Sequence, residues 1–128
     1  MGFDQYHEPP EELSQETRTL ARIFASLTEE AEAINWYEQR LSIEEDPDAR
    51  AIIEDARHEE YKHFSMDLEF LLRRRPEWRA IAEGVLFRAG SITDNADAAE
   101  EAAEEPGGET GGDGSDGSLG IGGLGARS

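Results

Sequence analysis

Apolar residues recur at intervals of three and four along the first part of the chain, which is typical of a helix with one buried face. The first stripe consists of Leu13, Thr17, Leu20, Phe24, Leu27, Ala31, Ile34, Glu38 and Leu41. It predicts a helix of about 30 residues, or roughly 45 Å. Pro9 and Pro10 suit its first turn, where a missing N–H group costs nothing. A break is expected at residues 42–46.

A second helix is predicted to begin at Asp46-Pro47-Asp48, which offers an N-cap acceptor, a proline at the first position and an acid near the positive helix end. Its stripe consists of Ile52, Ile53, Ala56, Glu60, His63, Phe64, Asp67, Phe70 and Leu71. Basic residues 73–75 suit the last turn, and Pro76 is expected to end the helix. A shorter third helix is predicted over residues 77–88, with Gly90 beyond its end.

The predicted fold class is all-α, because no segment alternates with a period of two over a useful length. Two long helices joined by a short loop form an antiparallel hairpin, here followed by a short C-terminal helix. Each long helix must bury its stripe, and two hairpins from two chains would close a four-helix bundle. Fewer than about 100 ordered residues cannot build a thick core, so we expect a homo-oligomer.

The composition separates a helical body from an acidic, glycine-rich tail. Of the 30 acidic residues, nine lie in residues 94–128, beside a single basic residue, and ten of the 13 glycines follow Pro106. Such a tail has too few large apolar side chains to offset the entropy lost on ordering. We therefore expect a helical domain over residues 1–93, a disordered linker over 94–118 and a distinct peptide over 119–128.

Composition also argues against several classes of protein. The chain has no cysteine, which removes disulfides, cysteine-ligated metal sites and thiol nucleophiles. No apolar run approaches the roughly 20 residues of a membrane span, and residues 1–5 lack the basic and apolar regions of a secretory signal. The net charge of -18 repels phosphate backbones, so neither a membrane nor a nucleic acid is an expected partner.

Glu60 and His63 lie within the second apolar stripe and form a Glu-x-x-His motif. This spacing places both side chains on one helix face, where they can bind one ion. Glu30 lies at the edge of the first stripe, and a buried carboxylate must be paired, protonated or bound to a metal. A di-iron carboxylate bundle needs two Glu-x-x-His motifs and two further glutamates. This chain has half of that set, which a two-fold dimer would complete.

Plainer interpretations of this motif stay open. Acidic helices produce Glu-x-x-His by chance, and Glu60 and His63 could bond to each other or to arginine in a coiled-coil-like dimer. Glu59 borders the stripe and could take the place of Glu60, and Asp67 could accept a hydrogen bond from His63.

The neighbouring residues have two interpretations each. Glu29 and Glu32 face outward, either as a solubilising acidic face or as a cation-attracting site beside Glu30. Trp36 and Tyr37 serve either interface packing or a metal centre. His7 and His58 are expected to be solvated.

The end of the tail carries three large aliphatic residues, Leu119, Ile121 and Leu124, separated by glycines. Apolar anchors spaced in this way suit an extended peptide that docks into a groove of another protein. Residues 106–118 would act as a flexible tether with a reach of roughly 20 Å.

These features together resemble the encapsulated ferritins, which are ferritin-like ferroxidases carried as cargo inside encapsulin nanocompartments. Residues 29–40 are similar to the family's first-helix block, residues 57–63 to its metal-binding block and residues 116–124 to its encapsulation signal. The resemblance implies a ferritin-like bundle with catalytic iron ligands at Glu30, Glu60 and His63. Each is contributed twice across a dimer interface, which then holds two iron ions.

The resemblance carries further expectations. Tyr37 and Trp36 would lie near the centre, with Tyr37 among the catalytic residues, and Glu29 and Glu32 would form an acidic metal-attracting site. Leu119, Ile121 and Leu124 would anchor the chain to the encapsulin shell protein. The assembly would be a ring-shaped decamer inside an encapsulin nanocompartment in the cytoplasm of a prokaryote.

The expected function is therefore that of a ferroxidase, which oxidises Fe(II) with dioxygen and supplies iron for mineral storage in the shell. Two alternatives stay open. A di-iron peroxidase or oxygenase would need an organic pocket or an electron-donor partner. A non-enzymatic helical adaptor, tethered by its C-terminal peptide, would bind no metal.

Overall fold

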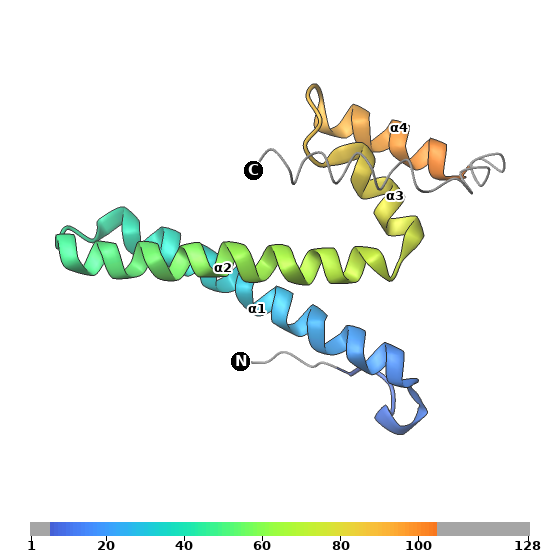
Figure 1. The fold of residues 1–128 in the computed structure, drawn as a ribbon, viewed down its shortest axis with the longest axis horizontal. Helices are drawn as coiled ribbons and strands as arrows, with labels where there is room; N and C mark the ends of the chain where they lie inside the picture. The colour runs from blue at the N-terminus through green and yellow to red at the C-terminus, as the bar shows by residue number, and fades with distance from the viewer. Residues whose placement is uncertain (1–5, 105–128) are drawn as a thin grey trace. The chain divides into compact units, whose positions relative to one another are not determined.

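The structure is a computed structural model, and it describes residues 6–104 (Figure 1). Within this range the chain forms four α-helices and one short 3₁₀ helix, and it has no strand. The predicted all-α fold class is thus confirmed. The chain divides into two compact units, one ending at Arg75 and the other beginning at Pro76.

The first unit begins with the 3₁₀ helix Pro10–Glu12, followed by the long helix α1 over Gln15–Ile43. The prediction that the long helix begins at Pro9 and Pro10 is wrong, because a short 3₁₀ helix precedes it. The prolines begin the 3₁₀ helix, and Ser14 then caps α1 by accepting a hydrogen bond from the Thr17 backbone N–H at 3.1 Å. A serine hydroxyl at this position satisfies a backbone donor that has no partner within the helix.

Helix α2 spans Pro47–Arg73, and its predicted start is confirmed. The Asp46 carboxylate accepts a hydrogen bond from the Ala49 N–H at 3.0 Å, and Pro47 occupies the first helical position. The turn between α1 and α2 is closed by Arg50, which donates to the backbone oxygens of Leu41 at 2.6 Å and Glu44 at 3.0 Å. These bonds satisfy carbonyls at the end of α1.

Helices α1 and α2 run in opposite directions, as the predicted hairpin requires (Figure 1). The described residues of the single chain bury only four large apolar side chains, Leu20, Leu41, Leu71 and Leu72. Other members of the predicted stripes are open to solvent, since Phe24 is 41% exposed and Ile52 is 70% exposed. Met66, which lies next to the second stripe, is 58% exposed. A hairpin this open has apolar surface that a second chain can cover.

The second unit contains helices α3, over Pro76–Val85, and α4, over Ile92–Glu104. Helix α3 ends three residues before the predicted boundary at residue 88. The chain turns there through two left-handed positions, with φ of 64° at Phe87 and 100° at Gly90. A left-handed residue cannot continue a right-handed helix, so the turn ends α3 early.

Helix α4 was not predicted. The expected disordered linker began at residue 94, whereas the structure has residues 92–104 helical. This stretch is rich in alanine, the strongest helix former, and its acidic composition hid that propensity. Helix α4 packs closely on α3, because a Cβ atom placed on Gly84 would clash with the Cβ atom of Ala99. The small apolar face of α4 thus finds a partner within the second unit.

Two further predictions concern membrane spans and the C-terminal targeting residues. No helix within residues 6–104 is both long enough and apolar enough to cross a bilayer. The predicted targeting residues Leu119, Ile121 and Leu124 lie outside the described residues, as does the glycine-rich segment before them.

Candidate metal centre

Glu30 on α1 meets Glu60 and His63 on α2. One ligand atom from each of the three side chains can be chosen so that all lie within 4.8 Å of one another. Among residues 6–104 no other three carboxylate or imidazole side chains meet this condition. The antiparallel pairing of α1 with α2 brings Glu30 close to Glu60 and His63, although they are about 30 residues apart in sequence. Two ion pairs join the paired segments on either side of this group, Glu16 with Arg75 and Glu38 with Arg57.

The spacing within the group suits a cation. The Nδ1 atom of His63 lies 3.7 Å from the Oε1 atom of Glu60, too far for a hydrogen bond. Two ligand atoms bound to the same ion with bonds of about 2.1 Å can be up to ~4.2 Å apart, so one ion can bridge this pair. Glu30 brings a second carboxylate from the opposite helix.

Each carboxylate of the group has one buried oxygen without a donor, and a bound cation would satisfy both oxygens. The Oε1 atoms of Glu30 and Glu60 are both buried and have no hydrogen-bond partner. A buried polar atom without a partner costs about 1–3 kcal/mol, and more if charged. Two hard carboxylate oxygens and a borderline imidazole nitrogen are ligand types that iron accepts. The residues present therefore fit an iron ion.

Asp67 adds a further acidic group beside Glu30. Burial, together with the hydrogen bond and charge of Asp67 and the charges of Glu60 and Glu29, raises the pKa of Glu30 to about 7. The Oδ2 atom of Asp67 is itself buried without a partner. Two ionised carboxylates cannot bond to each other, so that hydrogen bond exists only when one of them carries a proton. The electrostatics of this face thus favour binding a positive species, either a proton or a metal ion.

Glu59, the predicted alternative to Glu60, takes a different position. Its Oε1 atom lies 3.2 Å from the Lys62 ammonium and 4.0 Å from the Nε2 atom of His63, and its side chain is about half exposed. Glu59 is not part of the three-residue group. Glu29 and Glu32 are exposed, consistent with their predicted outward orientation.

Tyr37 and Trp36 lie on α1, about two turns beyond Glu30. Tyr37 is half-buried, and the Arg40 guanidinium lies 5.4 Å from the centre of its ring. Trp36 is 47% exposed. A separation of seven residues places Tyr37 on the same helix face as Glu30, roughly 10 Å along the axis. His7 and His58 are both exposed.

Sequence reasoning missed one network next to the group. The Oε2 atom of Glu38 accepts hydrogen bonds from the Arg57 Nη1 atom at 2.9 Å and from the Tyr61 hydroxyl at 3.4 Å. The available signal was Glu38 itself, a carboxylate within the apolar stripe of the first helix.

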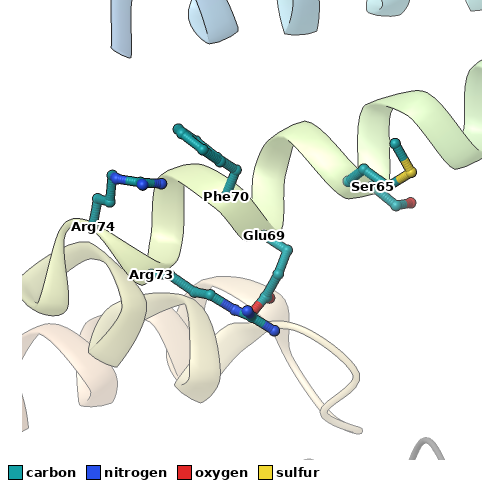
Figure 2. A pocket seen from close by; sticks show the side chains of 6 residues that line it. Ser65, Glu69, Phe70, Arg73 and Arg74 are labelled. Atoms are coloured by element: carbon teal, nitrogen blue, oxygen red, sulfur yellow. The ribbon is translucent and has the colours of Figure 1, made fainter. Parts of the chain in front are cut away.

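A pocket on α2 lies farther along the helix (Figure 2). It is lined by Ser65, Met66, Glu69, Phe70, Arg73 and Arg74. In it the Arg74 guanidinium lies 3.8 Å from the centre of the Phe70 ring, and Arg73 donates to Glu69 at 2.6 Å. The pocket shares no residue with the Glu30, Glu60 and His63 group, so it is not part of the candidate metal centre.

Comparison with known proteins identifies the family of the chain. A family model described as EncFtn-like matches residues 5–89. An encapsulated ferritin-like protein of Rhodospirillum rubrum is 42% identical over 121 residues, which cover 92% of this chain and 86% of that protein. A ferritin-like protein of Thermotoga maritima is 40% identical over 105 residues, covering 82% and 92% respectively.

A solved structure supports the same relationship. The crystal structure of a protein from Nitrosomonas europaea superposes with a TM-score of 0.67 at 39% sequence identity, covering 70% of this chain and 99% of the other. Family match, sequence identity and fold agree with the resemblance inferred from residues 29–40 and 57–63. The chain therefore belongs to the EncFtn-like family, the encapsulated ferritins.

Proposed function

We propose that this protein is a ferroxidase, which oxidises Fe(II) to Fe(III) with dioxygen at a di-iron site formed between two chains. The observation that carries the proposal is the group of Glu30, Glu60 and His63, with two buried carboxylate oxygens that have no donor. Two relatives are a ferritin-like protein and an encapsulated ferritin-like protein, and this relationship supports an iron-related function.

The need for a second chain follows from the number of ligands. A di-iron carboxylate centre takes four glutamates and two histidines, whereas one chain brings two glutamates and one histidine together. A two-fold axis beside the group would double it. Met66, three residues after His63 and therefore on a neighbouring part of the same face, is 58% exposed and offers apolar surface for such a contact.

Iron is the substrate of the proposed reaction. Two Fe(II) ions give up one electron each, and dioxygen takes both electrons with two protons. The products are two Fe(III) ions and hydrogen peroxide. The carboxylates of Glu30 and Glu60 hold the ions close together, and His63 supplies a nitrogen ligand from the same helix face as Glu60. We assign Tyr37 and Trp36 to the surroundings of this centre.

Glu29 and Glu32 have the exposure that an acidic approach to the centre would need. Their charges, within a chain of net charge -18, would raise the local concentration of Fe(II) in a salt-dependent manner. We propose that they attract the metal and that Glu30, Glu60 and His63 hold it.

Storage of the product requires a volume that a helical hairpin does not enclose. We propose that Leu119, Ile121 and Leu124 bind the shell protein of an encapsulin compartment in a prokaryotic cytoplasm. The chains, assembled as a ring-shaped decamer, then deliver Fe(III) into the lumen for mineralisation. The description of the Rhodospirillum rubrum relative as encapsulated supports this part of the proposal.

Stopped-flow measurement of Fe(II) oxidation in air tests the proposed activity. Glu60→Ala and His63→Ala should each remove the fast phase, because each removes a ligand from both halves of the site. The matched control is His7→Gln, since His7 is an exposed histidine in the same unit. Oxidation at the wild-type rate in either site variant would rule out this centre.

A further inference from the structure

Two oppositely charged groups on α2 remain apart although their positions favour contact. Arg57 and Glu60 are three residues apart on the same helix, the spacing at which side chains meet. The Nε atom of Arg57 and the Oε1 atom of Glu60 are both buried, and neither has a hydrogen-bond partner. Arginine and carboxylate groups in this position would ordinarily bond to each other. Another group must therefore hold Arg57.

That group is Glu38 on α1. Its Oε2 atom lies 2.9 Å from the Nη1 atom of Arg57 and also accepts the Tyr61 hydroxyl at 3.4 Å. The Arg57 guanidinium lies 5.7 Å from the centre of the Tyr61 ring, which adds a cation–π contact. The Arg57 side chain is 26% exposed, so its charge is partly removed from water and benefits from a fixed partner.

We propose that Glu38 is a positioning residue of the metal centre, which holds Arg57 away from Glu60 and so leaves the Glu60 carboxylate free to bind a cation. Without Glu38, the guanidinium would turn to Glu60, whose carboxylate has an unpartnered oxygen and lies three residues along the same helix. A bidentate arginine would then compete with the metal for the same oxygens. Tyr61 assists because its hydroxyl also donates a hydrogen bond to Glu38. This inference rests on the proposed function only in taking Glu30, Glu60 and His63 as a cation site.

Titration of the full chain with Co(II) tests the proposal, because cobalt absorbance reports binding without any oxidation. Glu38→Gln keeps the size of the side chain and removes its charge, and Glu38 is about half exposed, so the fold should tolerate the change. We expect its Co(II) affinity to fall by about tenfold or more, as when other supporting residues around metal ligands are changed. The Glu38→Gln, Arg57→Gln double variant should regain the wild-type affinity, because the competing cation is gone.

Glu16→Gln is the matched control. It breaks another ion pair made by a glutamate of α1, that of Glu16 with Arg75 at 3.5 Å. Glu16 lies 14 residues before Glu30 along α1. The Co(II) affinity of this variant should equal that of the wild type. Wild-type affinity in Glu38→Gln would overturn the proposal. So would equal weakness in the single and double variants, since that result assigns Glu38 a purely structural role.

The same titration separates this inference from the proposed function. A wild-type chain that binds no Co(II) overturns both. A wild-type chain that binds Co(II) but does not oxidise Fe(II) contradicts the ferroxidase proposal, while the comparison of Glu38 variants still decides the role of Glu38.

Discussion

Glu30 on α1 and Asp67 on α2 are two carboxyl groups that face each other across the helix pair. Burial, then the hydrogen bond and charge of Asp67, and then the charges of Glu60 and Glu29 raise the pKa of Glu30 to about 7. No arginine or lysine contact to Glu30 is found among the described residues, and its Oε1 atom is buried without a partner. The metal-free chain therefore holds several acidic groups close together on the face proposed to bind cations, and Glu30 keeps a proton there up to about pH 7.

This arrangement makes the stability of the metal-free protein depend on pH. The pKa of Glu30 is about 7 in the folded chain against an ordinary value of 4.5. The folded state therefore binds the proton more tightly than the unfolded state does. The stabilisation is complete below pH 4.5 and is lost as pH rises through about 7. We expect the metal-free wild type to lose stability relative to Glu30→Gln across this interval.

Urea unfolding in the presence of a chelator measures that difference. Glutamine cannot ionise, and all other acidic residues titrate in both proteins, so their contributions cancel to first order. A free-energy difference between the two proteins that stays constant from pH 4.5 to pH 8 would show that Glu30 titrates normally. Added Co(II) should reverse the order at high pH by binding the ionised wild-type site.

The packing of α3 on α4 predicts a second outcome. Alanine is ordinarily favoured over glycine within a helix by about 1 kcal/mol. At residue 84 the added Cβ atom would clash with the Cβ atom of Ala99, so we expect Gly84→Ala to destabilise the second unit by about 1–3 kcal/mol. Hydrogen exchange of amides in α3 and α4 measures the loss.

A compensating substitution provides the control for Gly84. In the Gly84→Ala, Ala99→Gly double variant, the clash is removed and protection from exchange should return. Co(II) binding should stay unchanged in both variants, because the metal group lies in the first unit. Increased protection in the single variant would mean that the two helices do not approach as closely as the structure shows.

The C-terminal peptide predicts a separation of targeting from chemistry. Removal of residues 119–128 should leave Fe(II) oxidation unchanged and prevent co-purification with a co-expressed encapsulin shell protein. Substitution of Leu119, Ile121 and Leu124 by serine should have the same effect, because apolar anchors drive the proposed docking. Asp113→Asn, a change in the preceding segment, serves as the control. Continued loading without the three aliphatic residues would refute their role as a signal.

The sequence predicted the long helices well because their signals are local. Asp46-Pro47 marked the start of α2 correctly, since a cap and a proline act within one turn. The N-terminal prolines gave a wrong start for the first long helix, because a proline suits a 3₁₀ turn as well as an α-helix. Helix α1 instead begins after its N-cap residue, Ser14. Helix α4 was missed because its acidic composition hid the helix propensity of its alanines, and because its contact with α3 at Gly84 and Ala99 forms only in the folded chain.

In the candidate site, too, the local features were predictable from the sequence and the contacts between helices were not. Spacing on one helix predicts that Glu60 and His63 share a face, and the position of Glu30 at the edge of the first apolar stripe predicts a second carboxylate from the other helix. The contact of Glu30 with Asp67 and the diversion of Arg57 to Glu38 depend on how α1 and α2 pair, which periodicity does not define. Residues that act across two helices are therefore the ones that sequence patterns leave out.

The central claim is that two chains together form a site that oxidises iron. We would separate the metal-free protein by size, add Fe(II) under air, and follow oxygen consumption and Fe(III) formation in each fraction. The account predicts fast, oxygen-dependent oxidation in fractions of dimer size or larger and only background oxidation in monomer fractions. Fast oxidation by the monomer, or none by a well-formed oligomer, would contradict it.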